Sequence, residues 1–197
     1  GIPESEYRCF NEDGEQSRRR GAGGPAYDPL SPHWQGYVRD VVREFAERYQ
    51  QHRSFAGIDI RLIKPVTSIV YPDLHWGYGD GVIAAFERDS GIKLPGEPDG
   101  PERFAMRKTI LQGELRDEFL SWREDCIAAF IASIADDLSS IRPDLKLYAS
   151  VIPGTVIPDV RFWETTAQME EPDWDAEAFR REIGMDLKQW ADITNLT

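Results

Sequence analysis

A helix pattern followed closely by a strand pattern occurs twice in this 197-residue chain, and this order restricts the fold more than any other feature. Residues 32–49 carry apolar side chains at helical spacing, and residues 55–62 then alternate apolar with polar ones. Residues 114–141 and 145–151 repeat the arrangement. Helices that alternate with short strands are typical of βα units around a parallel sheet. The sequence therefore predicts an α/β fold with parallel strands and flanking helices.

Several helices have recognisable first or last residues. Ser31, Asp80, Asp175 and Asp186 each precede or begin a helical pattern, and their side chains can cap the free backbone N–H groups there. Gly91 follows a short helix and is expected to end it. These residues set the expected helix boundaries.

The helix over residues 32–49 has one apolar stripe, which we expect to be buried. Its opposite face is charged, includes Arg39 and Arg43, and is expected to face solvent. The stripe consists of Trp34, Tyr37, Val38, Val41, Val42, Phe45 and Tyr49.

The composition indicates one globular domain over residues 1–197, with 41% hydrophobic and 29% charged residues. No apolar run approaches the roughly 20 residues of a membrane span, and the first residues show no signal-peptide pattern. A net charge of −12 argues against a nucleic-acid-binding protein, which needs a basic face. Cys9 and Cys126 form no metal motif, and no nucleotide or metalloprotease motif occurs, so no cofactor or metal is expected. The compartment, and a bridge between the two cysteines, are left open.

The loop after the first predicted strand carries the candidate site. It contains Asp73, His75, Trp76 and Tyr78. Aromatic rings beside carboxylates are typical of sugar-binding sites, because rings stack on sugar faces while carboxylates bind hydroxyls or move protons. The alternative is that these rings pack the loop onto its own domain and that His75 is structural.

Two further groups are expected near this loop. Asp59 and Arg61 share one face of the first strand and either orient a ligand or form a salt bridge. Trp163 and Glu164 follow the second strand, where Glu164 is either a second site carboxylate or a surface acid. Because glycoside hydrolysis uses two carboxyl groups, Asp73 and Glu164 are the predicted catalytic pair.

The chain from Tyr27 to Tyr148 resembles a large part of a (β/α)8-barrel glycoside-hydrolase-like protein, of the family 10 type and, more loosely, of the β-galactosidase and cellulase clan. The resemblance rests on YDPLSPHWQGYVRDVVREFAERYQQHRSFAGIDIRL, HWGYGDGVIAAFERDSGI and AAFIASIADDLSSIRPDLKLYAS. It implies an incomplete (β/α)8 TIM barrel, since a full one needs about 250 residues. In that clan the fourth strand ends in Asn-Glu, whereas this chain has Leu62-Ile63; the dipeptide Asn11-Glu12 lies in a polar, turn-like run instead.

Three functions follow as hypotheses. The first is a carbohydrate-active barrel that hydrolyses glycosidic bonds. The second, favoured by Leu62-Ile63, is a degenerate barrel that binds carbohydrate or serves as a scaffold. The third is an unrelated α/β enzyme that holds a metal between Asp59 and His75. An incomplete barrel exposes sheet edges that can pair with another chain, so an oligomer is an open alternative.

Overall fold

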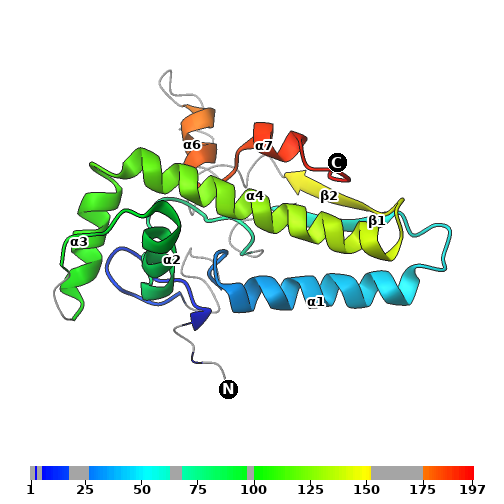
Figure 1. Cartoon of the computed structure of the whole chain (residues 1–197), viewed down its shortest axis with the longest axis horizontal. Helices are drawn as coiled ribbons and strands as arrows, with labels where there is room; N and C mark the ends of the chain where they lie inside the picture. The colour runs from blue at the N-terminus through cyan, green and yellow to red at the C-terminus, as the bar shows by residue number, and fades with distance from the viewer. Residues whose placement is uncertain (1–2, 4–5, 18–26, 63–67, 97–99, 152–174) are drawn as a thin grey trace, which may run out of the picture.

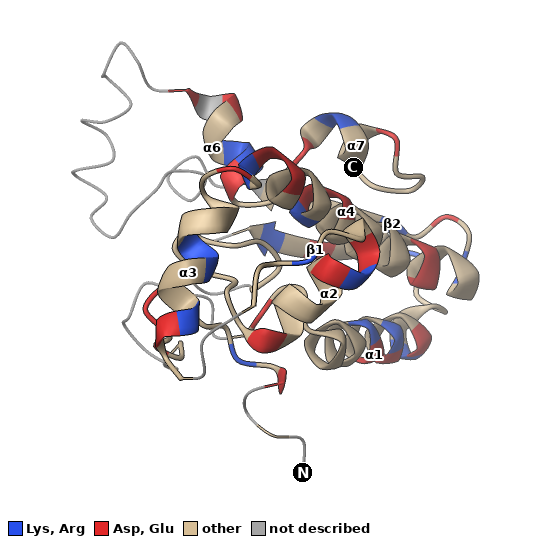
Figure 2. Cartoon of the chain, turned by 60° about the vertical axis from the view of Figure 1, so that its left-hand side comes forward, with Lys and Arg blue, Asp and Glu red and all other residues tan. Residues whose placement is uncertain are grey.

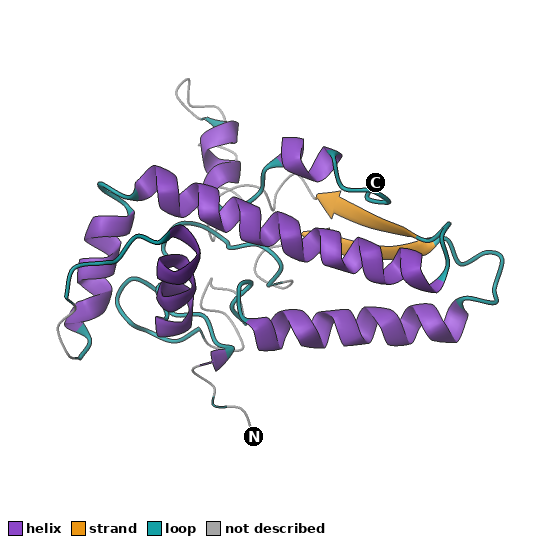
Figure 3. Cartoon of the chain, in the orientation of Figure 1, coloured by secondary structure: helices purple, strands orange, loops and turns teal. Residues whose placement is uncertain are grey.

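The computed structural model of the chain describes residues 3, 6–17, 27–62, 68–96, 100–151 and 175–197. Helices predominate over strands in this part of the chain (Figure 3). In chain order (Figure 1) the elements are α1 (Pro32–Tyr49), β1 (Gly57–Leu62), α2 (Asp80–Ser90), α3 (Glu102–Leu111), α4 (Arg116–Ile141), β2 (Lys146–Val151), α6 (Ala176–Glu182) and α7 (Leu187–Ala191).

The two strands form a parallel pair, as the sequence predicts. Their register runs from Gly57 opposite Lys146 to Leu62 opposite Val151. Gly57 has a φ of 150°, and a Cβ there would lie 1.8 Å from the carbonyl oxygen of Lys146, which explains the glycine at this close approach. The barrel prediction is supported only in part, because the described residues contain two strands and a complete barrel has eight.

The last residues of the chain extend this parallel arrangement. Leu196 forms a parallel bridge with Leu147 on the side of β2 away from β1. The Thr197 N–H donates to the carbonyl of Leu147 at 2.9 Å, and the Ala149 N–H donates to the carbonyl of Thr197 at 3.0 Å. Three segments, each preceded by a helix, thus lie parallel and in chain order, which is the sequence of neighbours found in βα barrels.

One face of the parallel pair packs against α1 and α4. Leu62 and Leu147 belong to this core, which also contains Ala46 of α1 and Ile131 of α4. Asp59, Arg61 and Ser150 are exposed and alternate with these core residues along the strands. The polar face of the strands is therefore the one that the helices leave uncovered.

The predicted burial of the α1 stripe is wrong for four of its seven members. Tyr37, Val41, Phe45 and Tyr49 are 36–63% exposed, whereas Val42 and Ala46 are buried. The reason is a buried carboxylate on α4: Arg39 and Arg43, expected to face solvent, turn toward α4 and bind Asp137. Acidic and basic residues are interspersed along α1 (Figure 2).

The predicted helix ends are mostly confirmed. The side chains of Ser31, Asp175 and Asp186 cap α1, α6 and α7, and Gly91 ends α2 in the left-handed region with φ 73°. The cap of α2 is Gly79 and not Asp80, whose carboxylate is drawn instead to two arginines of α3.

The N-terminal residues form no strand within the described range 6–17. Residues 7–10 provide only an isolated bridge between Phe10 and Gln16. Cys9 and Cys126 are free, so the bridge between them is not formed.

Candidate functional site

The polar face of the strands brings two predicted site residues together. The Ser150 hydroxyl donates to Asp59 Oδ1 at 2.7 Å, and Arg61 Nε lies 3.6 Å from Asp59 Oδ2. All three side chains are exposed. Because Arg61 and Ser150 are opposite each other in the strand register, they and Asp59 form one open polar group, with Arg61 and Ser150 in the carboxyl half of the strands and Asp59 next to the middle of β1. Such a group can donate to and accept from a polyhydroxylated ligand.

Asp73 and His75 are placed differently from this group. The His75 backbone N–H donates to Asp73 Oδ1 at 2.9 Å, and His75 Nδ1 lies 3.1 Å from Glu12 Oε2. Lys108 Nζ donates to Glu12 Oε1 at 2.6 Å, and Gln112 adds a third contact. Burial opposes ionisation of Glu12, but the hydrogen bonds from Lys108 and His75 outweigh it and lower the pKa of this carboxyl.

This network ties the loop after β1 to the N-terminal residues. Glu12 N–H also donates to the carbonyl of His75 at 3.0 Å, and Asn11 pairs with Trp76 in an antiparallel bridge. The Asn11-Glu12 dipeptide therefore has a structural role here, because it holds the loop against the N-terminal residues.

Trp76 and Tyr78 lie in the core. Trp76 is buried and Tyr78 is fully buried, with its hydroxyl donating to the carbonyl of Leu74 at 2.7 Å and accepting from Gln112 at 2.8 Å. Burial raises the pKa of Tyr78 to about 12. Both rings therefore pack the loop onto its own domain, which is the alternative that the sequence left open. Trp163 and Glu164 lie outside the described residues.

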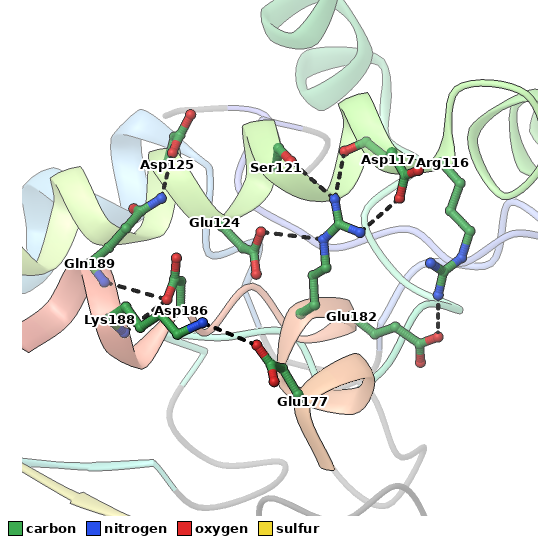
Figure 4. Close-up of polar contacts among 11 residues, drawn as sticks. Arg116, Asp117, Ser121, Glu124, Asp125, Glu177, Glu182, Asp186, Lys188 and Gln189 are labelled. Carbon is green, nitrogen blue, oxygen red and sulfur yellow. Dashed lines mark hydrogen bonds and ion pairs between the residues drawn. The ribbon is translucent and has the colours of Figure 1, made fainter. Parts of the chain in front are cut away.

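A polar hollow that the sequence reasoning missed lies between α4, α6 and α7 (Figure 4). It has a volume of about 280 Å³. Glu124 projects into it from α4 and is largely buried, with Arg181 Nε at 3.6 Å. The remaining lining residues are Glu177, Arg180, Met185, Asp186, Leu187 and Lys188.

Glu124 is the carboxyl of this hollow that is suited to hold a proton. Burial raises its pKa, and the charges of Asp186 and Asp125 add to the effect while Arg181 opposes it. Arg181 is itself fixed by Asp117 of α4, whose Oδ1 accepts from it at 2.7 Å. A protonated carboxyl beside a guanidinium can act as a general acid toward a bound oxygen. The sequence could not reveal the hollow, because α6 and α7 begin more than fifty residues after Glu124.

No metal site emerges from the described part of the chain, where no group of three or more His, Cys, Asp or Glu side chains is placed to hold an ion. Asp59 contacts Ser150 while His75 contacts Glu12, so the metal hypothesis gains no support from their geometry.

The comparisons with known proteins bear on the fold. No protein-family model and no curated protein matches the chain. Among solved structures, the chain is similar to the catalytic domain of β-amylase from Paenibacillus polymyxa, with a TM-score of 0.58 and 15% identity. The match covers 98% of this chain and 51% of that chain, so this chain spans about half the length of the structure it matches.

At 15% identity the similarity concerns the fold alone. It supports the predicted barrel-like fold, of the kind found in a β-amylase catalytic domain, while the family 10 assignment stays a prediction. None of the helices in the described ranges has the length and apolar character that crossing a bilayer requires.

Proposed function

We propose that this chain is part of a carbohydrate-active barrel and that a saccharide binds over the polar face of β1 and β2. The observation that carries the proposal is the fold similarity to a β-amylase catalytic domain along 98% of the chain. Asp59, Arg61 and Ser150 support it, because they offer carboxylate, guanidinium and hydroxyl groups on the face that the helices leave open. In parallel barrels, ligand groups gather at the carboxyl ends of the strands.

Hydrolysis of glycosidic bonds is the proposed activity, with Asp73 and Glu164 as the proposed pair of carboxyl groups. Glu124 is a separate candidate proton donor, for a ligand that enters the hollow between α4, α6 and α7, because its raised pKa keeps it protonated at higher pH than an ordinary glutamate. The test is the rate of hydrolysis of a panel of aryl glycosides and polysaccharides.

The variants Asp73→Asn, Glu164→Gln and Glu124→Gln are each expected to lower kcat by about 100-fold if the group transfers a proton. Glu177→Gln is the matched control, because Glu177 lines the same hollow but is exposed at its rim. Unchanged rates in all three variants would remove these role assignments.

The alternative function is a degenerate barrel that binds saccharide without cleaving it. One observation favours it: Leu62, which stands where the resembled clan has its acid/base dipeptide, is only 2% exposed and packs among core residues. Calorimetric binding of an oligosaccharide by protein that shows no turnover would decide for this alternative.

A further inference from the structure

An aromatic hollow at the N-terminal end of α1 is lined by none of the candidate site residues described above. It has a volume of about 270 Å³ and is lined by Tyr7, Tyr27, His33, Trp34 and Tyr37. We infer that this hollow is a second contact site for a neutral saccharide chain, which stacks on its rings. The inference takes its ligand class from the proposed function and adds a separate place where that ligand binds.

The rings of the hollow are preorganised for stacking. Tyr27 and Trp34 stack with centroids 4.4 Å apart and planes inclined by 22°, and Trp34 and Tyr37 follow at 5.9 Å and 25°. Trp34 Nε1 donates to the carbonyl of Ser68 at 2.8 Å, which fixes the indole. Tyr37 is 63% exposed. These nearly parallel rings, one of which is open to solvent, form a face on which a ligand can stack. Because the rings are already ordered, little side-chain entropy is lost when a ligand binds.

The charges around the hollow select against ionic ligands. The Arg8 guanidinium lies 5.6 Å from the centroid of Tyr27 and 5.9 Å from that of Tyr7, where it would repel a quaternary ammonium group. Glu6, which binds His33 Nε2 at 2.9 Å, lies beside the hollow, and its negative charge, together with the net charge of −12, offsets the attraction of Arg8 for an anion.

The groups that remain suit a neutral ligand rich in hydroxyls. The hydroxyls of the tyrosines and the pair formed by His33 and Glu6 can donate to and accept from such a ligand at the edge of the rings. A saccharide combines apolar ring faces with hydroxyl edges, and this combination matches the hollow. A helix of another protein is the rival occupant, because the exposed face of α1 continues through Phe45 and Tyr49.

The test is calorimetric titration of the whole chain with maltohexaose and with cellohexaose. For at least one of them, Tyr37→Ala is expected to weaken binding tenfold or more, and Tyr37→Phe to retain affinity within threefold because the ring remains. Phe45→Ala is the matched control, since it removes an exposed ring from the same helix outside the hollow, and is expected to stay within twofold of the unaltered chain. Thermal melts verify that each variant is folded.

Three outcomes would overturn the inference: affinity unchanged in Tyr37→Ala, equal losses in Tyr37→Ala and Phe45→Ala, or no binding of either hexasaccharide. Asp59→Asn separates this site from the proposed one. If Asp59→Asn abolishes binding and Tyr37→Ala does not, saccharide binds at the strand face and not in the aromatic hollow. The reverse result leaves the hollow standing and removes the strand face.

Discussion

At the scale of single residues, a buried polar group beside the loop after β1 makes stability depend on pH. Asp28 is buried, and it accepts from the Tyr71 hydroxyl at 2.5 Å and from the Leu30 N–H at 3.0 Å. The Arg123 guanidinium lies 3.7 Å from the centroid of the Tyr71 ring, and its three nitrogens have no hydrogen-bond partner in the described structure. Burial raises the pKa of Asp28, and the hydrogen bonds and Arg123 offset this only in part.

A carboxyl whose pKa is higher in the folded than in the unfolded chain destabilises the folded state as it ionises. Its contribution is absent below the unfolded pKa of about 3.9, and stability falls as pH rises from there through the raised folded pKa. Asp28→Asn is therefore expected to gain stability relative to the unaltered chain as pH rises from 4 upward. Urea unfolding at a series of pH values measures the difference, with the exposed Asp13→Asn as control. A difference that does not change with pH would contradict this role of Asp28.

At the scale of elements, the packing of α1 on α4 depends on one carboxylate. Asp137 accepts from Arg39 Nε at 2.6 Å and from Arg43 at 2.5 Å. Burial opposes ionisation of Asp137, but the bonds from both arginines outweigh it and lower its pKa. The stabilisation is therefore present above the unfolded pKa of about 3.9 and is lost as pH falls through the lower folded pKa.

Asp137→Asn is expected to lower the free energy of unfolding by about 2 kcal/mol at neutral pH. The reason is that it removes the charge-assisted hydrogen bonds from Arg39 and Arg43, which are both partly shielded from solvent. Chemical denaturation measures the change. The neighbouring Asp136→Asn is the control, since Asp136 is exposed on the same turn of α4. Equal effects of the two substitutions would show that the packing of α1 does not depend on Asp137.

The same pair of helices shows what the sequence could and could not predict. Helical spacing and capping residues predict α1 at its observed bounds, and alternation predicts β1 and β2, because these signals are local. The rotation of α1 could not be predicted, since it depends on Asp137, which lies about a hundred positions away. In the candidate site, Asp59 and Arg61 are adjacent on one strand and were recognisable, whereas the hollow around Glu124 forms only when α6 and α7 fold back onto α4.

At the scale of the whole molecule, the described part of the chain leaves an apolar surface uncovered along α1. α1 lies along one margin of the molecule (Figure 1). Of the five exposed large hydrophobic residues in the described part of the chain, four are on it: Tyr37, Val41, Phe45 and Tyr49. Their spacing of four residues makes a continuous apolar stripe along the helix. In a complete barrel the outer helices pack against one another, so the part of the stripe beyond the aromatic hollow, Val41, Phe45 and Tyr49, would be covered by a neighbouring helix.

Because apolar stripes of this kind drive association, we expect the chain alone to self-associate through α1 as its concentration rises. Phe45→Lys places a charge in the middle of the stripe and is expected to shift the sedimentation velocity distribution toward the monomer. Glu47→Gln changes the net charge by the same amount on an exposed position of the same helix and is expected to leave the distribution unchanged. A monomer at all concentrations for the unaltered chain, or equal shifts in both variants, would show that the stripe is not an association surface. A shift confined to Phe45→Lys would identify the exposed face of α1 as the surface through which two copies of the chain associate.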